Sequence, residues 1–207
     1  GLGGFTGRYL AKELELAGYS VFGTAHGSET IGPGMYSVDL CDRVSLVRVV
    51  ADVQPHVVVH LAAISFVGHS DVDAVYRTNI VGSRNLLEAL AGMAQKPRSV
   101  LLVSSSNVYG NSVVEMLDES IPPAPANDYG VSKLAMEYMA RIWMDRLPII
   151  LTRTFNYTGL GQSPQFLIPK IVEHFRRGEH EIELGNIDVE RDFSDVRMVA
   201  RAYAALL

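Results

Sequence analysis

Short apolar runs alternate along the chain with segments of helical periodicity, and this alternation constrains the fold more than any other feature. The runs at 57–59 and 101–103 are continuous rather than alternating, as in strands buried on both faces of a parallel sheet. We expect strands over these runs: 19–25, 35–40, 57–61, 100–104, 148–153 and 181–184. Strand–helix alternation of this kind predicts an α/β fold with a doubly wound parallel sheet and helices on both faces.

The segments between these runs predict helices. The first helix ends at Gly18 and has one apolar face, formed by Tyr9, Leu10, Leu14 and Ala17. Asp42 stands where an N-cap would begin the next helix. Two longer helices are expected over 71–90 and 128–146, and the prolines in 121–125 indicate a loop.

Composition and charge exclude several classes of function. Apolar residues make up 48% of the chain and charged residues 20%, which is typical of a globular protein and not of a disordered one. The net charge of −5 argues against a nucleic-acid partner. No apolar run is long enough to cross a membrane, and no pattern predicts a metal site. Cys41 is the single cysteine, which fits a reducing cytoplasmic location.

A glycine-rich loop opens the sequence, with Gly1, Gly4 and Gly7 in G-x-x-G-x-x-G spacing before the first helix. Glycines let the backbone approach a pyrophosphate, and the following helix directs free N–H groups at the anion. Glycine-rich turns also occur for purely structural reasons, but the βα repeats that follow favour a dinucleotide site. Such a loop normally follows a buried strand. We therefore expect a window of a longer protein that lacks its first strand and a C-terminal piece.

The end of the second expected strand bears on the choice of cofactor. An acidic residue there would bond the ribose 2′-hydroxyl and select NAD. The strand ends instead at Ala25 and His26, with neither an acid nor an arginine, which slightly favours NADP over NAD. Asp39, after the third strand, is a candidate acceptor for the adenine amino group, or alternatively a turn residue.

Tyr129 and Lys133 lie one helical turn apart, on the same face of the expected helix. A free tyrosine has a pKa of about 10. A lysine charge ~4 Å away, at an effective dielectric of ~20, contributes about 4 kcal/mol, which predicts a phenol pKa near 7. Tyr-x-x-x-Lys alone is common on amphipathic helices, so the surrounding motifs decide its meaning.

Two further polar groups are expected near this pair. Ser105 follows a buried strand, and a side chain at the carboxyl end of such a strand points into the ligand-binding crevice. Asn79 lies on the helix between the two neighbouring strands, where it is either part of the site or an ordinary buried polar group.

The motifs GLGGFTG, HLAAISF, TNIVGSRNLLEA, SSSNVYG and YGVSK occur here in the order found in extended short-chain dehydrogenases/reductases that act on nucleotide sugars. The chain resembles that family over nearly its whole length. The resemblance implies a Rossmann-like fold, with Tyr129 as the acid/base and Ser105 bonding the reacting oxygen. Lys133 would hold the nicotinamide ribose, and Asn79 would complete a proton relay. The predicted cofactor site comprises Gly1, Gly4, Phe5, Gly7, Ala25, His26, Asp39, Leu40, Leu61, Ala62, Ala63, Tyr129 and Lys133.

The C-terminal third resembles the GDP-mannose branch of that family, in the stretches 153–166 and 185–197. The resemblance implies that Asn156 and Arg191 contact the substrate diphosphate and that Lys170 lies near the nucleotide. Arg191 could instead pair with a neighbouring acid on a solvated turn. The predicted substrate site comprises Ser105, Ser106, Asn107, Asn156, Lys170 and Arg191.

These motifs divide the chain into a dinucleotide-binding domain over 1–153 and a partial substrate-binding lobe over 154–207. Resemblance also implies a homodimer through the helices 71–90 and 128–146. Around the catalytic stripe of the second helix lie more apolar residues than one face needs: Val131, Leu134, Met136, Tyr138 and Met139.

Three functions are open at this stage. The first is reduction of a GDP-4-keto-6-deoxy sugar with NAD(P)H, the second is dehydration or 4-epimerisation of a GDP- or UDP-sugar, and the third is a non-catalytic cofactor sensor. Family 4,6-dehydratases use a glutamate as the C5 base at the position of Asn107. An amide accepts no proton at neutral pH, so Asn107 argues against dehydration, and the GDP-branch motifs favour reduction.

Overall fold

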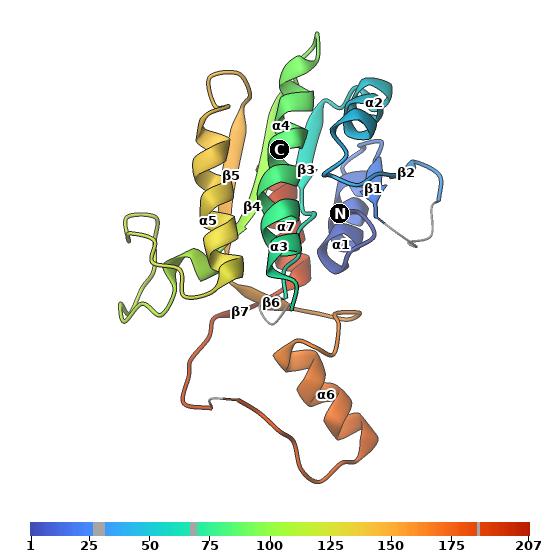
Figure 1. Ribbon diagram of the computed structural model, residues 1–207. Helices are drawn as coiled ribbons and strands as arrows, with labels where there is room; N and C mark the ends of the chain where they lie inside the picture. The colour runs from blue at the N-terminus through green and yellow to red at the C-terminus, as the bar shows by residue number, and fades with distance from the viewer. Residues whose placement is uncertain (27–31, 67–69, 186) are drawn as a thin grey trace.

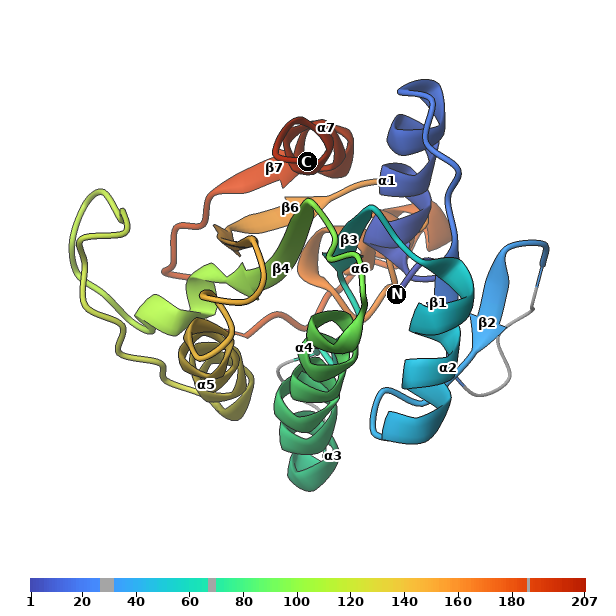
Figure 2. The same ribbon diagram turned by 90° about the horizontal axis from the view of Figure 1, so that it is seen from above.

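The computed structural model describes residues 1–26, 32–66, 70–185 and 187–207. Helices cover both faces of a set of parallel strands (Figure 1, Figure 2). One face is covered by α2 (Arg43–Val53), α3 (Val72–Tyr76), α4 (Ser83–Gly92) and α5 (Asp128–Arg141). The opposite face is covered by α1 (Phe5–Leu16) and α7 (Val196–Ala205). The expected Rossmann-like α/β fold is confirmed.

The strands form three groups, each with parallel pairing. The first joins β1 (Gly23–Ala25) to β2 (Met35–Ser37). The second has the order β3 (Val57–His60), β4 (Ser99–Ser105) and β5 (Ile149–Thr154). The third joins β6 (Asn156–Thr158) to β7 (Phe193–Asp195).

An apolar cavity of about 190 Å³ is lined by residues of both β1 and β3, which do not pair with each other in the described structure. Its walls include Leu2, Val21 and Leu90. The expected burial of the continuous apolar runs therefore holds for one strand only. All seven residues of β4 are buried, because it has a partner on each side, whereas β3 is mostly half-buried.

Two hydrophobic clusters pack against the two faces of the central strands. Leu46, Leu87 and Leu102 belong to the cluster under α2, α4 and α5, and all three are almost completely buried. Leu10, Leu101 and Tyr203 belong to the cluster under α1 and α7. The sheet thus covers the apolar faces of the helices on both sides.

Several predicted boundaries are wrong. The run 181–184, which was expected as a strand, is irregular. The runs 19–25 and 35–40 are strands only over their β1 and β2 portions. The helix expected over 71–90 consists of α3, α4 and a π-helical turn between them, η1 (Arg77–Gly82). The helix expected over 128–146 ends with α5 and continues as turns.

Helix termini follow the expected chemistry in two cases. Asp42 caps α2, because its carboxylate accepts hydrogen bonds from the N–H groups of Val44 and Ser45 at 3.1 and 3.2 Å. Gly18 ends α1 with a φ of +85°, a left-handed conformation that costs glycine little. The sequence did not point to Asn127 as the cap of α5, where its side chain accepts from the N–H of Gly130 at 2.8 Å.

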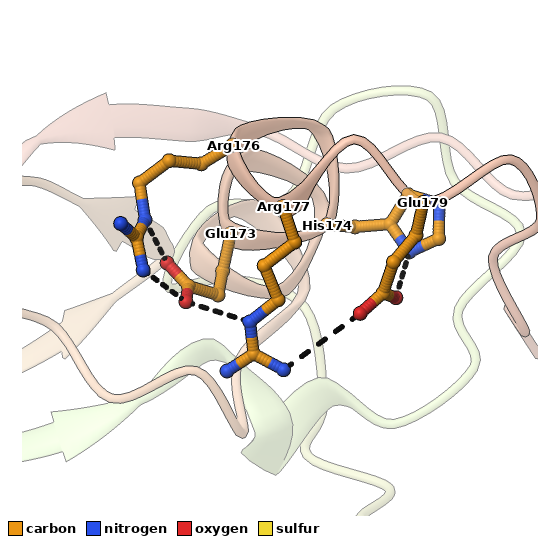
Figure 3. A network of polar contacts seen from close by, with 5 residues as sticks. All are labelled: Glu173, His174, Arg176, Arg177 and Glu179. Carbon is orange, nitrogen blue, oxygen red and sulfur yellow. Dashed lines mark hydrogen bonds and ion pairs between the residues drawn. The ribbon is translucent and has the colours of Figure 1, made fainter.

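Helix α6 (Leu167–Arg177) lies beyond the carboxyl ends of the strands (Figure 1). Its polar face is a network of ion pairs centred on Glu173, which Arg176 and Arg177 both contact, with His174 and Glu179 beside it (Figure 3). Such exposed pairs add little stability, about 0.3–0.5 kcal/mol each on a helix.

Candidate active site

A cavity of about 900 Å³ is lined by the glycine loop, the ends of the strands and the first part of α6. Its size suits a dinucleotide together with a substrate. Every residue of the predicted cofactor site lines it, from Gly1 in the loop to Lys133 on α5. Four predicted substrate residues line it as well: Ser105, Asn107, Asn156 and Arg191.

Three predicted site residues do not line this cavity. Asn79 is buried behind it, with an exposed fraction of 1%. Ser106 begins the short 3₁₀ helix η2 (Ser106–Tyr109) and is absent from the cavity wall. Lys170 lies on the exposed side of α6, where its ammonium donates to the carbonyl of Glu183 at 2.5 Å.

The start of α1 has the features of an anion site. Its N-cap is Gly4, which offers no side-chain hydrogen bond, and its first turn carries no acidic residue. The amide groups of the first turn therefore keep their donors for a ligand, and the helix dipole favours negative charge there. A β-carbon on Gly7 would lie 2.2 Å from the carbonyl oxygen of Gly1, so only glycine permits this tight turn. This donor set fits the diphosphate of a dinucleotide.

Ser105 and Tyr129 form the centre of the cavity. Ser105 is the last residue of β4, and Tyr129 is the second residue of α5, so a strand end and a helix start bring the two side chains to the same place. Both side chains line the cavity, and the Ser105 hydroxyl acts to lower the pKa of Tyr129. The site residues expected from the motifs are thus brought together at the carboxyl edge of the strands.

Lys133 is almost fully buried beside this pair, and its ammonium lies 5.9 Å from the centre of the Tyr129 ring. It donates to the carbonyl of Val103 on β4 at 2.8 Å. Burial lowers the pKa of Lys133 to about 8, opposed by the nearby charge of Glu137.

The pKa of Tyr129 differs from the expected value near 7. Burial raises it to about 12, although the hydrogen bond from Ser105 lowers it. The expectation was wrong because it counted the lysine charge and left out the cost of ionising a buried phenol. A phenol with this pKa carries its proton throughout the neutral range.

Asn79 joins three elements. Its side chain accepts from the backbone N–H of Ile64 at 2.9 Å, and it donates to the carbonyl of Ile64 and to the hydroxyl of Ser132. Ser132 lies on α5 between the two predicted catalytic residues, and Ile64 follows β3. Asn79 therefore fixes α5 against the loop after β3, from the π-helical turn η1.

Asp39 takes the turn position that the sequence left open, since its carboxylate accepts from the N–H of Cys41 at 2.8 Å. It also lines the cavity, so adenine contact is compatible with this turn. Arg191 donates to the carbonyl of Glu190 and remains exposed at the cavity wall.

Tyr157 is a cavity residue that the sequence reasoning missed. It lies on β6 and contacts the residues that follow the first glycines of the loop. Its hydroxyl is 2.9 Å from that of Thr6, and its ring stacks on that of Phe5. Its position next to Asn156 was the available signal. Strand β6 has only three residues, too few to show a period.

Among residues 1–26, 32–66, 70–185 and 187–207, no helix is long and apolar enough to cross a membrane. The same residues contain no group of three or more His, Cys, Asp or Glu side chains that could hold a metal ion.

A parallel α/β sheet, a glycine loop opening a helix, and Ser, Tyr and Lys in one cavity together define a dehydrogenase/reductase of the extended short-chain type. The chain belongs to the NAD dependent epimerase/dehydratase family, whose model matches residues 1–207. The expected family and NAD(P) cofactor class are confirmed.

Two curated relatives are similar over most of the chain. The GDP-6-deoxy-D-talose 4-dehydrogenase of Aggregatibacter actinomycetemcomitans is 36% identical over 93% of the chain, which spans 63% of that relative's length. The GDP-6-deoxy-D-mannose reductase of Pseudomonas aeruginosa is 33% identical over 100% of the chain, which spans 68% of that relative's length.

Two solved structures have the same fold. A protein from Burkholderia cenocepacia J2315 is 51% identical, with a TM-score of 0.91, over 98% of this chain and 68% of that one. The structure of RMD from Pseudomonas aeruginosa complexed with NADPH is 32% identical, with a TM-score of 0.79, over the same shares of the two chains.

Proposed function

We propose that the protein reduces the C4 ketone of a GDP-linked 4-keto-6-deoxyhexose with NAD(P)H. The observation that carries this proposal is the meeting of Ser105, Tyr129 and Lys133 in one cavity with a neutral amide, Asn107, beside them. The two curated relatives support it, since their names place their chemistry on GDP-6-deoxyhexoses.

The proposed chemistry needs one hydride and one proton. A bound reduced dinucleotide supplies the hydride that adds to C4. Tyr129, protonated because burial raises its pKa to about 12, donates its proton to the oxygen as negative charge develops there. Ser105 donates a hydrogen bond to the same oxygen. The buried Lys133 holds the nicotinamide ribose and supports the Tyr129 anion once the proton has left.

Dehydration is disfavoured by the same arrangement. Removal of the C5 proton needs a base, and Asn107 cannot accept a proton at neutral pH. No such base is required for reduction of a ketone.

We assign the rest of the site by the same reasoning. Asn156 and Arg191 are proposed to bind the substrate diphosphate, because both line the cavity and an arginine fork suits phosphate oxygens. In this scheme Ser106, Lys170 and Asn79 do not contact the cofactor or the substrate. Asn79 acts instead by holding α5 in place. We also propose that 1–153 binds the dinucleotide and that 154–207 contributes to the substrate lobe.

A 4-epimerase is the second candidate, because it uses the same Ser, Tyr and Lys set and recycles its cofactor. A UDP-glucuronic acid 4-epimerase from Bacillus cereus, in complex with UDP-glucuronic acid and NAD, has the same fold with a TM-score of 0.85 at 25% identity.

The two candidates differ in net cofactor use. The full-length protein is expected to consume NADPH or NADH, followed at 340 nm, when GDP-4-keto-6-deoxymannose is added. It is also expected to leave GDP-mannose unchanged. Epimerisation of a UDP-hexose with retained NAD, or conversion of GDP-mannose without net cofactor use, would contradict the proposal.

A further inference from the structure

Both acceptor positions of the Ser105 hydroxyl are filled by one residue. The backbone N–H of Asn107 donates to Ser105 Oγ at 3.2 Å, and the side-chain amide of Asn107 donates to the same atom at 3.1 Å. A hydroxyl oxygen has two acceptor lone pairs and one proton. With both lone pairs occupied, Ser105 can act toward any further partner only as a donor.

The orientation of the Asn107 amide is fixed from its other side. Asn127 donates to Asn107 Oδ1 at 3.4 Å, a long contact, while its own Oδ1 accepts from the N–H of Gly130. Because an amide has one oxygen and one NH₂ group, an oxygen that faces Asn127 leaves the NH₂ group for Ser105. The N-cap of α5, three residues before Gly130, thereby sets which end of Asn107 faces the catalytic serine.

The backbone packing ties the same elements together. A β-carbon on Gly130 would lie 2.6 Å from the carbonyl oxygen of Asn107, so η2 and α5 are in direct contact at this point. Tyr129 precedes Gly130 in the chain. The position of Asn107 and the position of the Tyr129 backbone are therefore coupled.

We propose that Asn107 is a positioning residue that holds Ser105 as a one-way hydrogen-bond donor, first to the Tyr129 oxygen and then to the ketone oxygen of the substrate. The last step rests on the proposed function. An aspartate side chain at this position would offer only hydrogen-bond acceptors, so the Ser105 hydroxyl could donate to it and not to the ketone. The residue at position 107 thus determines whether Ser105 donates or accepts its hydrogen bonds. As an amide, it also provides no base for removal of the C5 proton.

A Ser105 hydroxyl that donates to the phenol oxygen would favour the phenolate, in agreement with the lower pKa that Ser105 gives Tyr129 against the effect of burial.

A double-mutant cycle in the full-length protein tests the proposal. Asn107→Leu, which keeps the side-chain volume and removes the donor, is expected to lower kcat about 5- to 10-fold with KM little changed. In a Ser105→Ala background the same substitution should cost nothing further, because it acts through the serine. Asn111→Leu, at an exposed amide of the following loop, is the matched control and should leave kcat unchanged. If the double variant loses kcat by the product of the two single-variant factors, the two residues act independently and the proposal is overturned.

A second measurement does not depend on the substrate. With ζ-¹³C-labelled tyrosine, the Tyr129 resonance, identified by its loss in Tyr129→Phe, should shift in Asn107→Leu and stay in place when that change is added to Ser105→Ala. If the chemical shift of Tyr129 is the same in Asn107→Leu and in the native protein, the proposed role of Asn107 is wrong. A resonance that shifts in a protein that reduces no GDP-linked ketone supports that role and contradicts the proposed function instead.

If Asn107→Leu fails to fold, Asn107→Asp replaces it in the cycle. Its kcat should rise as the pH falls through the titration of the new carboxyl, because a protonated carboxyl regains a donor for Ser105. A profile parallel to that of the native protein would count against the proposal.

Discussion

At the scale of single residues, the cavity depends on side chains whose protonation is set by burial. Tyr129 is the clearest case, because the same burial that raises its pKa also makes it a proton donor over the neutral range. We expect Tyr129→Phe to fold and bind cofactor but to lose turnover by at least ~10²-fold, the usual scale of general acid–base catalysis. Steady-state kinetics, with melting temperatures matched, provide the measurement. Near-normal turnover would rule out the assignment.

His60 makes the stability of the fold depend on pH. It is buried at the end of β3 and hydrogen bonded to Ser83 at 2.8 Å, and burial lowers its pKa from 6.5 to about 3. Between these values the unfolded chain binds a proton that the folded chain does not, so stability falls as the pH falls from about 6.5 toward 3. The slope from this one group reaches at most about 1.4 kcal/mol per pH unit.

Urea unfolding at several pH values measures this slope. His60→Gln should flatten it, whatever its effect on stability at pH 7, whereas His56→Gln, at an exposed position, should not. Equal slopes in the native protein and the His60 variant would show that other groups dominate.

All but three of the predicted site residues line the cavity, because a glycine loop and the end of a buried strand leave little freedom in where their side chains lie. Sequence reasoning failed where the outcome depends on contacts between distant segments. Tyr157 reaches the glycine loop through a strand too short to have a pattern. Lys170 lies on a face of α6 away from the cavity, where it bonds the carbonyl of Glu183 in the segment after that helix. The pKa of Tyr129 was misjudged for the same reason, since burial is a property of the folded chain.

At the scale of elements, the contact between η2 and α5 holds Ser105 and Tyr129 in register. Gly130→Ala would place a methyl group 2.6 Å from the carbonyl of Asn107, so the two elements must separate. We expect a loss of about 1–3 kcal/mol in the free energy of unfolding, together with reduced turnover. Gly92→Ala is a matched control in α4, where a β-carbon meets nothing within 4 Å, and it should be neutral or stabilising. Chemical denaturation compares the two variants, and equal stabilities would contradict the packing argument.

The elements that were predicted correctly are those with their own pattern. Strand β4 is buried along its whole length and has a continuous apolar run, and α2 has both an apolar face and a capping aspartate. The run 181–184 was also expected as a strand but pairs with no described strand, so it stays irregular. Strands β6 and β7 exist because they pair with each other, which neither sequence segment reveals alone.

At the scale of the whole molecule, the predicted cofactor preference depends on the edge of the cavity formed by β1. Ala25 and His26 line it, and neither supplies the carboxylate that would bond the ribose 2′-hydroxyl and select NAD. We therefore expect NADPH to bind at least as tightly as NADH. Fluorescence titration of the full-length protein with both cofactors decides this. A tenfold or larger preference for NADH would show that another residue selects the ribose.

The outer faces of η1 and α5 predict how the molecule associates. Met136 belongs to the core, which corrects its assignment to this surface, but Tyr138 is 55% exposed and Ile142, just beyond α5, is 75% exposed. Val81 of η1 is also exposed. Apolar side chains on neighbouring helices favour a homodimer in which these helices pack against their counterparts.

We expect the full-length protein to sediment as a dimer at micromolar concentration. The double change Tyr138→Glu with Ile142→Glu should yield a folded monomer, because it places carboxylates in an interface that excludes water. Leu16→Glu, on the exposed side of α1, is the control with a similar gain of charge and should leave the dimer intact. Sedimentation velocity separates the two states, and circular dichroism verifies the fold. A native protein that sediments as a monomer contradicts the prediction outright. A dimer that persists in the double variant and dissociates in the Leu16 variant would move the interface to the face of α1 and leave the outer face of α5 outside it.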